Sequence, residues 1–321
     1  MPRIAILDDY QQVALELADW SSLAGQAEVR SFDRPLGPIV EAAAALAGFD
    51  MVVLMRERQP FPRALFEALP RLRCVVTTGL RNAAIDLAAA RDHGVTVCHT
   101  RSGATEYGTC ELTWALILAA ARHLPLEERR LREGRWQTTI GHSLHGKTLG
   151  LLGLGRLGIR VAVVGSAFGM QVIAWSPHLT DERAASGGAQ RVSKDDLLSR
   201  SDVLSLHLVL APGTRGIVGA AELARMLPHA LLVNTSRAGL VDETALLDAL
   251  EGKRIGGAAL DVFEQEPLPR GHPFTRLDNV VLSPHLGYVT RESYGIFFHD
   301  VVENITAFLA GTPLRVLAAD A

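Results

Sequence analysis

The motif GLGRLG, residues 153–158, constrains the fold of this chain more than any other feature of its sequence. It follows the apolar run TLGLL and precedes the helical run IRVAVVGSAFG. In that context Gly153 permits a tight turn, Gly155 lets the backbone approach a pyrophosphate, and Gly158 lets the helix pack on the strand. Glycines that serve only a turn are the alternative, but the flanking strand and helix favour a dinucleotide-binding unit.

Strand-like runs alternate with helical runs on both sides of this motif, which predicts an α/β protein with parallel sheets. Before the motif the strand candidates are RIAILDD, VRSFD, MVVLMR, RCVVTTG and VTVCHT, and the helical candidates are ALELADW (14–20), Ile39–Ala47 and IDLAAARDHG. From residue 147 onward six strand candidates suit a Rossmann sheet, namely KTLGLLGLG, VIAWS, DVLSLHL, ALLVNTS, IGGAALDVF and NVVLSPH.

Two further helical segments organise the chain. The apolar spacing from Glu111 to Arg122 predicts a connecting helix, and the charged stretch LPLEERRLREGRW after it predicts an arm that ends at Trp136. The amphipathic segment from Glu292 to Leu309 predicts a helix that returns to the first lobe.

Composition favours small-molecule chemistry. The chain has 32 Lys and Arg against 35 Asp and Glu, a net charge of -3, so neither nucleic acid nor a membrane is expected as a partner. The three cysteines have no CxxC spacing and the 11 histidines have no ligand spacing, which predicts buried thiols, no metal site and a cytoplasmic location. The amino terminus does not resemble a signal peptide, and Leu112–Ala121 is shorter than the ~20 residues of a membrane helix.

Ser176 occupies the position that decides the cofactor. It follows the second strand of the nucleotide-binding unit, where an Asp or Glu usually accepts hydrogen bonds from the ribose 2′-OH. A serine removes the charge that would repel a 2′-phosphate, and His178, Thr180 and Arg183 could supply further donors. We therefore expect NAD(P)(H), with NADP(H) favoured; a site that accepts both cofactors is the alternative, because no arginine follows the serine directly.

Three polar residues follow predicted strands of the second lobe and suit the reduction of a 2-oxo acid. Arg237 has the forked guanidinium that binds a carboxylate and polarises a carbonyl, and His285 titrates near neutrality as a general acid requires. Glu266 could orient the imidazole and stabilise its protonated form. Taken alone, each residue also has an ordinary interpretation. Arg237 could be a surface arginine, Glu266 a solvated acid and His285 a loop histidine.

The chain resembles the D-isomer-specific 2-hydroxyacid dehydrogenase family, which includes glyoxylate/hydroxypyruvate reductases and phosphoglycerate dehydrogenase. The resemblance covers essentially the whole chain, through GKTLGLLGLGRLG, NTSRAGLVDETAL, GGAALDVFEQEP and SPHLGY in the expected order. It implies two Rossmann-like domains, with an NAD(P)-binding parallel-sheet domain (102–287) inserted into a flavodoxin-like, substrate-binding catalytic domain (1–101 and 288–321). It also implies an enzyme that transfers hydride between NAD(P)H and a small 2-oxo acid such as glyoxylate or hydroxypyruvate.

The resemblance also implies roles for individual residues. Arg237 would bind and polarise the substrate, His285 would be the acid/base, and Glu266 its partner. Asp261 would face the nicotinamide carboxamide. The remaining cofactor-binding positions would be Gly153, Gly155, Arg156, Leu157, Gly158, Ser176, His207, Thr214, Thr235, Ser236 and Gly287, and the substrate-binding positions Gly79, Leu80, Arg81 and Arg56.

Departures from the family pattern bear on the substrate. Arg81 stands where relatives often carry Asp, so it either favours an acid with a distal anion or faces solvent. Arg56 and Arg58 lie on another loop that borders the substrate cleft in relatives. Val75 and Val76 replace an arginine of phosphoglycerate dehydrogenases, which argues against 3-phosphoglycerate. The chain ends at Ala321, so we expect no added regulatory domain.

Two questions remain open at the level of sequence. The resemblance also extends to NADH-sensing transcriptional corepressors of the same fold, so a binding protein without significant turnover is the alternative function. The family implies a homodimer, with Leu112–Leu144, including Trp114 and Trp136, as the candidate interface. Packing of these apolar residues within one subunit is the alternative.

Overall fold

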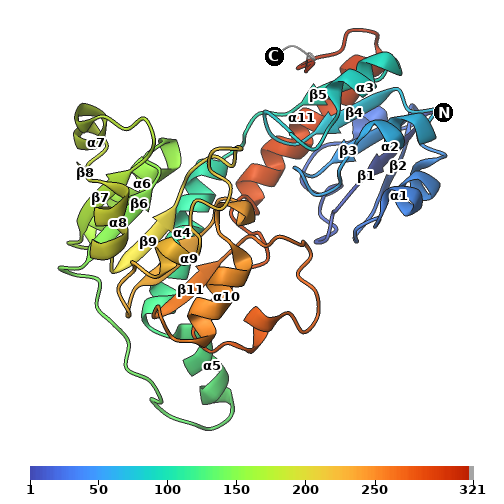
Figure 1. The fold of residues 1–321 in the computed structure, drawn as a ribbon. Coiled ribbons are helices and arrows are strands. Elements are labelled where there is room, and N and C mark those ends of the chain that lie inside the picture. Colours follow the sequence, from blue (N-terminus) through green and yellow to red (C-terminus); the bar gives the residue numbers. More distant parts are fainter. Residues whose placement is uncertain (318–321) are drawn as a thin grey trace. The chain divides into compact units, whose positions relative to one another are not determined.

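The computed structural model describes residues 1–317 and consists of two compact units (Figure 1). Unit 1 comprises Met1–Ala104 and the C-terminal segment from Thr290, and unit 2 comprises Thr105–Val289. Each unit contains one sheet in which every pair of neighbouring strands is parallel. The predicted fold class, two parallel-sheet α/β domains, is confirmed.

The sheet of unit 1 has the strand order β2-β1-β3-β4-β5, which is the flavodoxin-like order. β3 and β4 are buried at every position, as expected for a parallel sheet covered on both faces. The elements are β1 (Arg3–Ile6), β2 (Glu28–Ser31), α1 (Ile39–Leu46), β3 (Met51–Leu54), α2 (Arg63–Ala68), β4 (Cys74–Thr77), α3 (Leu87–Asp92) and β5 (Thr96–His99), with the short 3-10 helix η1 (Ser21–Leu23) after β1.

The helix predicted over residues 14–20 is wrong, because this stretch forms turns. Asp9 accepts hydrogen bonds from the amides of Val13 and Ala14, and the indole of Trp20 donates to the carbonyl of Ala14 at 3.0 Å. The side chain of Asp19 accepts from the amide of Ser21 at 2.9 Å. These side-chain bonds offer the backbone an alternative to a helical ladder.

The long helix α11 (Arg291–Leu309) packs on β4 and η1 and so belongs to unit 1, as the amphipathic pattern predicted (Figure 1). Its Asp300 is fully buried and accepts from the amide of Arg101 at 2.8 Å and from its guanidinium Nη2 at 2.6 Å. Burial alone raises the pKa of Asp300, but the hydrogen bonds from Arg101 and the charge of Arg315 outweigh it and lower the pKa. The segment after β5 is thereby tied to the returning helix.

The sheet of unit 2 has the order β12-β11-β10-β9-β6-β7-β8, a Rossmann order extended by one strand. All six predicted strands are present as β6 (Thr148–Leu152), β7 (Gln171–Trp175), β9 (Val203–Leu206), β10 (Leu231–Asn234), β11 (Gly257–Leu260) and β12 (Val280–Leu282). The edge strand β8 (Gln190–Arg191) was missed because it has two exposed polar residues and no apolar run. The helices are α6 (Arg156–Ala167), α7 (Asp181–Ser186), α8 (Lys194–Arg200), α9 (Ala220–Leu223) and α10 (Glu243–Glu251), with η2 (Ala238–Leu240) and η3 (Pro273–Arg276).

The connecting segment forms two helices, α4 (Thr105–Ala121) and α5 (Leu124–Arg132), separated at His123, which has a left-handed backbone with φ 53°. α4 packs on β10, β11 and α6, and its Trp114 is buried against Phe168 with ring centroids 5.0 Å apart. Trp114 therefore belongs to the core of unit 2, and its assignment to a subunit interface is wrong. No helix within residues 1–317 is long and apolar enough to cross a membrane.

The arm after α5 has no regular secondary structure, yet it is held in place by side chains of that helix. The carboxylate of Glu127 accepts from both the amide and the hydroxyl of Thr138, at 3.1 and 2.6 Å, and Arg130 donates to the same hydroxyl at 2.6 Å. On this arm Trp136 and Ile140 are 75% and 92% exposed. These two apolar side chains are thus presented at the surface on a fixed segment.

We predict that Asp300→Asn lowers the stability of the protein by about 2 kcal/mol, because it leaves Arg101 without its buried charged acceptor. The pKa of Asp300 is lowered in the folded state, so its contribution is complete at neutral pH and is lost as the pH falls through that pKa. Urea unfolding at pH 7 and at about pH 3 measures both effects. Asp92→Asn, which breaks an exposed pair with Arg63, is the control and should leave the midpoint unchanged. A difference between wild type and Asp300→Asn that grows on acidification contradicts the prediction.

Candidate active site

The glycine motif of unit 2 forms a turn into α6 whose geometry fits a pyrophosphate. Gly153 has a positive φ of 107°, and a Cβ at this position would lie 2.7 Å from the carbonyl carbon of His207. A Cβ on Gly158 would lie 2.4 Å from the carbonyl oxygen of Gly153. Gly155 precedes α6, where no side chain caps the helix and a Cβ would meet nothing within 4 Å. The backbone amides at this helix start are therefore open to an anionic group, which is the environment a dinucleotide phosphate requires.

His207 lies directly behind this turn. Its Nε2 is 2.9 Å from the hydroxyl of Ser205, while its Nδ1 is buried without a hydrogen-bond partner among the described residues. Burial lowers the pKa of His207 to about 4, so the ring is neutral at physiological pH. Arg156 and Leu157 are the first two residues of α6; Arg156 is exposed and Leu157 is half-buried.

Ser176 directly follows β7, the neighbour of β6 in the sheet, as predicted. The hydroxyl of Thr180 caps α7 by accepting from the amide of Arg183 at 3.3 Å. The guanidinium of Arg183 donates to the carbonyl of His178 at 3.2 Å and so lies across the same loop. Ser176, His178 and Thr180 therefore lie on the loop between β7 and α7, and Arg183 of α7 reaches back to that loop.

The predicted threonine and serine positions shape the loops of unit 2. Each hydroxyl is engaged within the unit: Thr214 donates to the carbonyl of Val209 at 2.7 Å, Ser236 donates to the carbonyl of Leu208 at 2.8 Å, and Thr235 shares a hydrogen bond with Thr113 at 2.8 Å. The bonds of Thr214 and Ser236 hold the loops after β9 and β10, and that of Thr235 fixes the end of β10 to α4.

The predicted catalytic residues follow three adjacent strands. Arg237 follows β10, Glu266 follows β11 and His285 follows β12, and these parallel strands end at one edge of the sheet. Glu266 Oε2 is 2.6 Å from His285 Nδ1, and Glu266 Oε1 accepts from the amide of Phe263 at 3.0 Å. The ring of His285 packs edge-on against Tyr288, with centroids 5.5 Å apart. The structure thus joins Glu266 and His285 in a pair through Nδ1 of the imidazole.

Arg237 is held through its own loop. Its Nη1 donates to the carbonyl of Ser236 at 2.8 Å, and its carbonyl accepts from Asn234 at 3.0 Å. Its backbone is extended, with φ -142° and ψ 139°, immediately before η2. The guanidinium is half-buried at the end of β10.

Asp261 is fully buried at the end of β11 and holds the loop that carries His285. Its Oδ1 accepts from the Ser283 hydroxyl at 2.6 Å and from the Leu286 amide at 2.7 Å, and its Oδ2 accepts from the Gly287 amide at 3.0 Å. Burial raises the pKa of Asp261, while these donors and the charge of His285 act in the opposite direction. Three of the roughly four acceptor positions of a carboxylate are used within the protein.

The substrate-binding candidates of unit 1 surround a constrained turn. Gly79 has a positive φ of 87°, and its amide donates to the hydroxyl of Thr100 at 2.7 Å. A Cβ on Gly79 would lie 1.6 Å from Nη1 of Arg56, so that guanidinium lies directly against the glycine, whose positive φ favours glycine here. Asn82 donates to the carbonyl of Arg56 at 2.6 Å, and Arg81 is exposed. Leu80 is 43% exposed.

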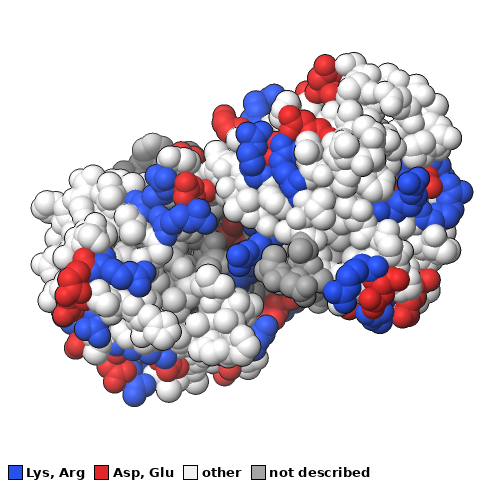
Figure 2. Space-filling view, turned by 90° about the horizontal axis from the view of Figure 1, so that it is seen from above, with Lys and Arg blue, Asp and Glu red and all other residues white. Residues whose placement is uncertain are grey.

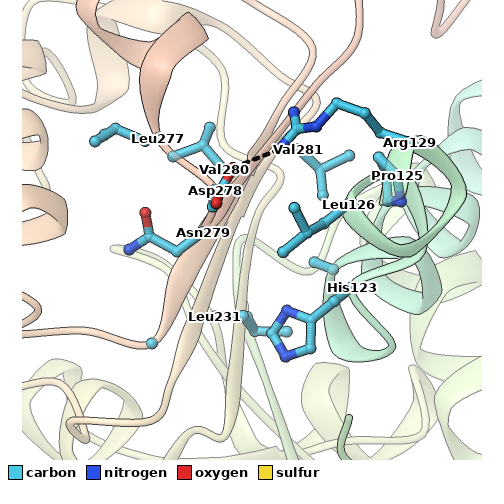
Figure 3. A pocket seen from close by; sticks show the side chains of 12 residues that line it. His123, Pro125, Leu126, Arg129, Leu231, Leu277, Asp278, Asn279, Val280 and Val281 are labelled. Carbon is cyan, nitrogen blue, oxygen red and sulfur yellow. Dashed lines mark hydrogen bonds and ion pairs between the residues drawn. The ribbon is translucent and has the colours of Figure 1, made fainter. Parts of the chain in front are cut away.

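A pocket of unit 2 lies away from these residues (Figure 3). Leu231, Gly256 and Val280 line it near the starts of β10, β11 and β12, whereas Arg237, Glu266 and His285 follow the ends of those strands. The guanidinium of Arg129 and the carboxylate of Asp278 meet at 2.6 Å on one side of the pocket (Figure 3). This pocket therefore takes no part in the candidate active site.

The surface agrees with the charge balance of the sequence. In Figure 2 basic and acidic side chains are interspersed on the visible face, and no field of one sign covers it. No group of three or more His, Cys, Asp or Glu residues suited to a metal ion occurs within residues 1–317.

Several supporting residues were not identified from the sequence. Ser283 bonds Asp261, Tyr288 packs on His285, and Thr109 donates to the carbonyl of Gly287 at 2.8 Å. Ser283 and Tyr288 lie inside the SPHLGY motif, so the motif itself was the available signal. No signal in the sequence indicated Thr109, because its contact with Gly287 depends on how α4 packs.

Part of the chain matches a known protein family. Residues 114–287 match the NAD binding domain of the D-isomer specific 2-hydroxyacid dehydrogenases. The chain belongs to this family. The prediction of an NAD-binding oxidoreductase is thereby confirmed at the level of the family.

The similar proteins carry names that indicate different substrates, glyoxylate in one case and 3-phosphoglycerate in another. The chain is 43% identical to a glyoxylate reductase of Aeropyrum pernix over 77% of the chain and 76% of that protein. It is 37% identical to a D-3-phosphoglycerate dehydrogenase of Synechocystis over 82% of the chain, a match that spans 48% of that longer protein. A solved phosphoglycerate oxidoreductase of Vibrio cholerae superimposes with a TM-score of 0.91 at 38% identity, covering 97% of this chain and 100% of that one.

Proposed function

We propose that this protein is an NAD(P)H-dependent reductase of small 2-oxo acids, such as glyoxylate or hydroxypyruvate, that forms the corresponding D-2-hydroxy acids. The observation that carries this proposal is the 2.6 Å contact between Glu266 and His285. It lies at the sheet edge where Arg237 also stands, in a unit with an open glycine turn. Unit 2 would bind the nucleotide, and unit 1 would contribute the substrate-binding residues Gly79, Leu80, Arg81 and Arg56.

The residues of the chain supply charge and protons to this reaction. When bound, the reduced nicotinamide supplies a hydride to the keto carbon. The guanidinium of Arg237 binds the substrate carboxylate and polarises the carbonyl, and His285 delivers a proton from Nε2 to the carbonyl oxygen. Glu266 holds the imidazole through Nδ1 and stabilises its protonated form. In the reverse direction the neutral His285 accepts the proton of the hydroxyl group.

We predict that the purified protein oxidises NADH or NADPH with at least one short 2-oxo acid, and that His285→Asn lowers kcat about 10³-fold through loss of the general acid. Absorbance at 340 nm with glyoxylate, hydroxypyruvate and pyruvate measures this. His299→Asn, on the exposed side of α11, is the matched control and should retain full activity. Cofactor binding without turnover on any 2-oxo acid would instead favour the alternative, a nucleotide-sensing binding protein.

We also propose that the loop after β7 admits NADP(H) in preference to NAD(H), because Ser176 adds no negative charge beside the 2′ position. Arg183 lies across the same loop, with its guanidinium on the carbonyl of His178. Asp261, His207, Thr214, Thr235, Ser236 and Gly287 would complete the cofactor site.

We predict that Ser176→Asp raises the Kd of NADPH about 10-fold, which corresponds to roughly 1.4 kcal/mol of like-charge repulsion. The Kd of NADH should stay equal or fall, because the carboxylate accepts from a free 2′-OH. Fluorescence titration with each reduced cofactor measures both constants. Ser186→Asp, at the far end of α7, adds the same charge away from the site and should change neither Kd. If Ser176→Asp raised the Kd of NADPH and of NADH by the same factor, this result would contradict the proposal.

A homodimer is the assembly we propose, with the arm after α5 at its interface. Trp114 is buried within unit 2, so the proposal now depends on Trp136 and Ile140, which the arm presents to solvent. A cytoplasmic location remains a prediction from the scattered cysteines.

We predict that Trp136→Glu converts the dimer to a monomer, because it places a charge in the apolar contact. Light scattering coupled to size exclusion measures the mass. Val163→Glu, an exposed apolar position on α6, is the control and should remain dimeric. An unchanged dimer in Trp136→Glu would remove this residue from the interface.

A further inference from the structure

The segment after α11 covers one edge of the sheet in unit 1. β5 is the last strand in the order β2-β1-β3-β4-β5, and residues 315–317 pair with it in antiparallel direction. The amide of Leu317 donates to the carbonyl of Val97 at 2.8 Å, and the amide of His99 donates to the carbonyl of Arg315 at 2.9 Å. An uncovered edge strand can pair with other chains, so covering it is an ordinary structural role. The further contacts of Arg315 indicate a second role.

Arg315 holds both backbone polar groups of His99, the last residue of β5. The carbonyl of Arg315 accepts from the His99 amide. Nη1 of Arg315 donates to Oδ1 of the buried Asn304 at 2.8 Å, and Nδ2 of Asn304 donates to the His99 carbonyl at 2.9 Å. Because a guanidinium only donates, it fixes which end of the Asn304 amide faces His99. The position of His99 thus depends on Arg315 both directly and through Asn304.

Carboxylates of α11 hold the guanidinium of Arg315. Its Nη2 forms an ion pair with Glu303 and lies 3.6 Å from Oδ1 of the buried Asp300. The backbone of Arg315 has a left-handed φ of 49°, which non-glycine residues adopt rarely and which concentrates at functional sites. Arg315 therefore joins α11 to the end of β5 through a side chain and a backbone that are both constrained.

The residue after His99 contacts the turn at Gly79. Thr100 is fully buried, and its hydroxyl accepts from the amide of Gly79 at 2.7 Å while it donates to the carbonyl of Arg101 at 2.9 Å. The amide of Thr100 donates to the carbonyl of Thr77 at 3.1 Å, so two hydrogen bonds join the end of β5 to the end of β4 and the turn after it. The conformation of that turn thus depends on where Thr100 is held.

We propose that Arg315 is a positioning residue for the turn at Gly79, and that it acts through His99 and Thr100. This inference rests on the proposed reductase function, in which that turn contributes to binding of the 2-oxo acid. The turn belongs to unit 1 and the glycine motif for the nucleotide belongs to unit 2. Loss of Arg315 should therefore weaken substrate binding and leave cofactor binding unchanged, whereas a segment that only covers a sheet edge would affect stability alone.

The first test measures kinetics with whichever of glyoxylate, hydroxypyruvate and pyruvate the wild-type protein reduces best. Arg315→Met should raise the KM for that acid about 10-fold, while kcat and the Kd of the reduced cofactor change less than about twofold. Arg315→Lys keeps a donor for Asn304 and should restore part of the wild-type KM. Arg63→Met, which removes an exposed ion pair with Asp92, is the matched control in unit 1 and should leave the KM unchanged.

The second test determines whether Arg315 acts through Thr100. Thr100→Val removes the acceptor of the Gly79 amide and should raise the KM about as much as Arg315→Met, whereas Thr100→Ser keeps the hydroxyl and should retain a low KM. Both changes interrupt the same series of contacts, so the KM of the double variant should stay within about threefold of the larger single effect. Independent structural effects would instead multiply to about 100-fold, and that result would contradict the proposal.

The third test observes the turn itself and needs no substrate. Amide hydrogen exchange in the peptide that covers residues 77–82 should be faster in Arg315→Met than in the wild-type protein, because the turn loses part of its support. Arg63→Met should leave this exchange unchanged. If Arg315→Met does not fold, Arg315→Lys takes its place and should show a smaller increase in both the exchange rate and the KM.

The results separate this inference from the proposed function. A wild-type KM in a folded Arg315→Met protein, or unchanged exchange in residues 77–82, would overturn the positioning role and leave the reductase function standing. Equal weakening of substrate and cofactor binding would show a general loss of structure and would also overturn that role. If the protein reduces no 2-oxo acid, the proposed function fails, and the exchange measurement alone then decides whether Arg315 positions the turn.

Discussion

The buried carboxylate of Asp261 is the interaction on which the candidate active site depends. An ionised carboxylate removed from water is costly unless donors surround it, and here one hydroxyl and two backbone amides do so. The amides belong to Leu286 and Gly287, directly after His285, so satisfying Asp261 fixes the backbone of this loop. His285 adopts a left-handed φ of 56° in that loop, and its Nδ1 then meets Glu266. A Cβ on Gly287 would lie 3.3 Å from the same carboxylate, a tight contact that leaves little room for a side chain.

Parallel sheets bring the functional loops of each unit together. All strands of a unit end at the same edge, so residues far apart in sequence meet there without any motif that links them. In unit 2 this edge carries Arg237, Glu266 and His285, and the glycine turn follows β6 of the same sheet. In unit 1 the corresponding edge carries Gly79 and Arg56. The pocket of Figure 3 lies by the opposite ends of the strands in unit 2, which separates it from this chemistry.

The successes and failures of sequence-based prediction have physical causes. The strands of the Rossmann sheet were identified because buried parallel strands are short continuous apolar runs. Strand β8 has no such run, since both of its residues are polar and exposed, and it was therefore missed. The apolar residues of 14–20 suggested a helix, but side-chain bonds from Asp9, Asp19 and Trp20 stabilise turns there. Trp114 was assigned to an interface because hydrophobicity alone does not distinguish a core contact from a contact between subunits.

The sequence by itself determined the order of strands and helices, the glycine turn with its helix, and the position of Ser176 at the end of β7. These features depend on local periodicity and on backbone conformations that glycine permits. Only the tertiary structure decided that Glu266 touches His285 and that Asp261 holds the loop that carries His285. Such contacts depend on which strands become neighbours and how helices pack on them, and no local pattern contains that information.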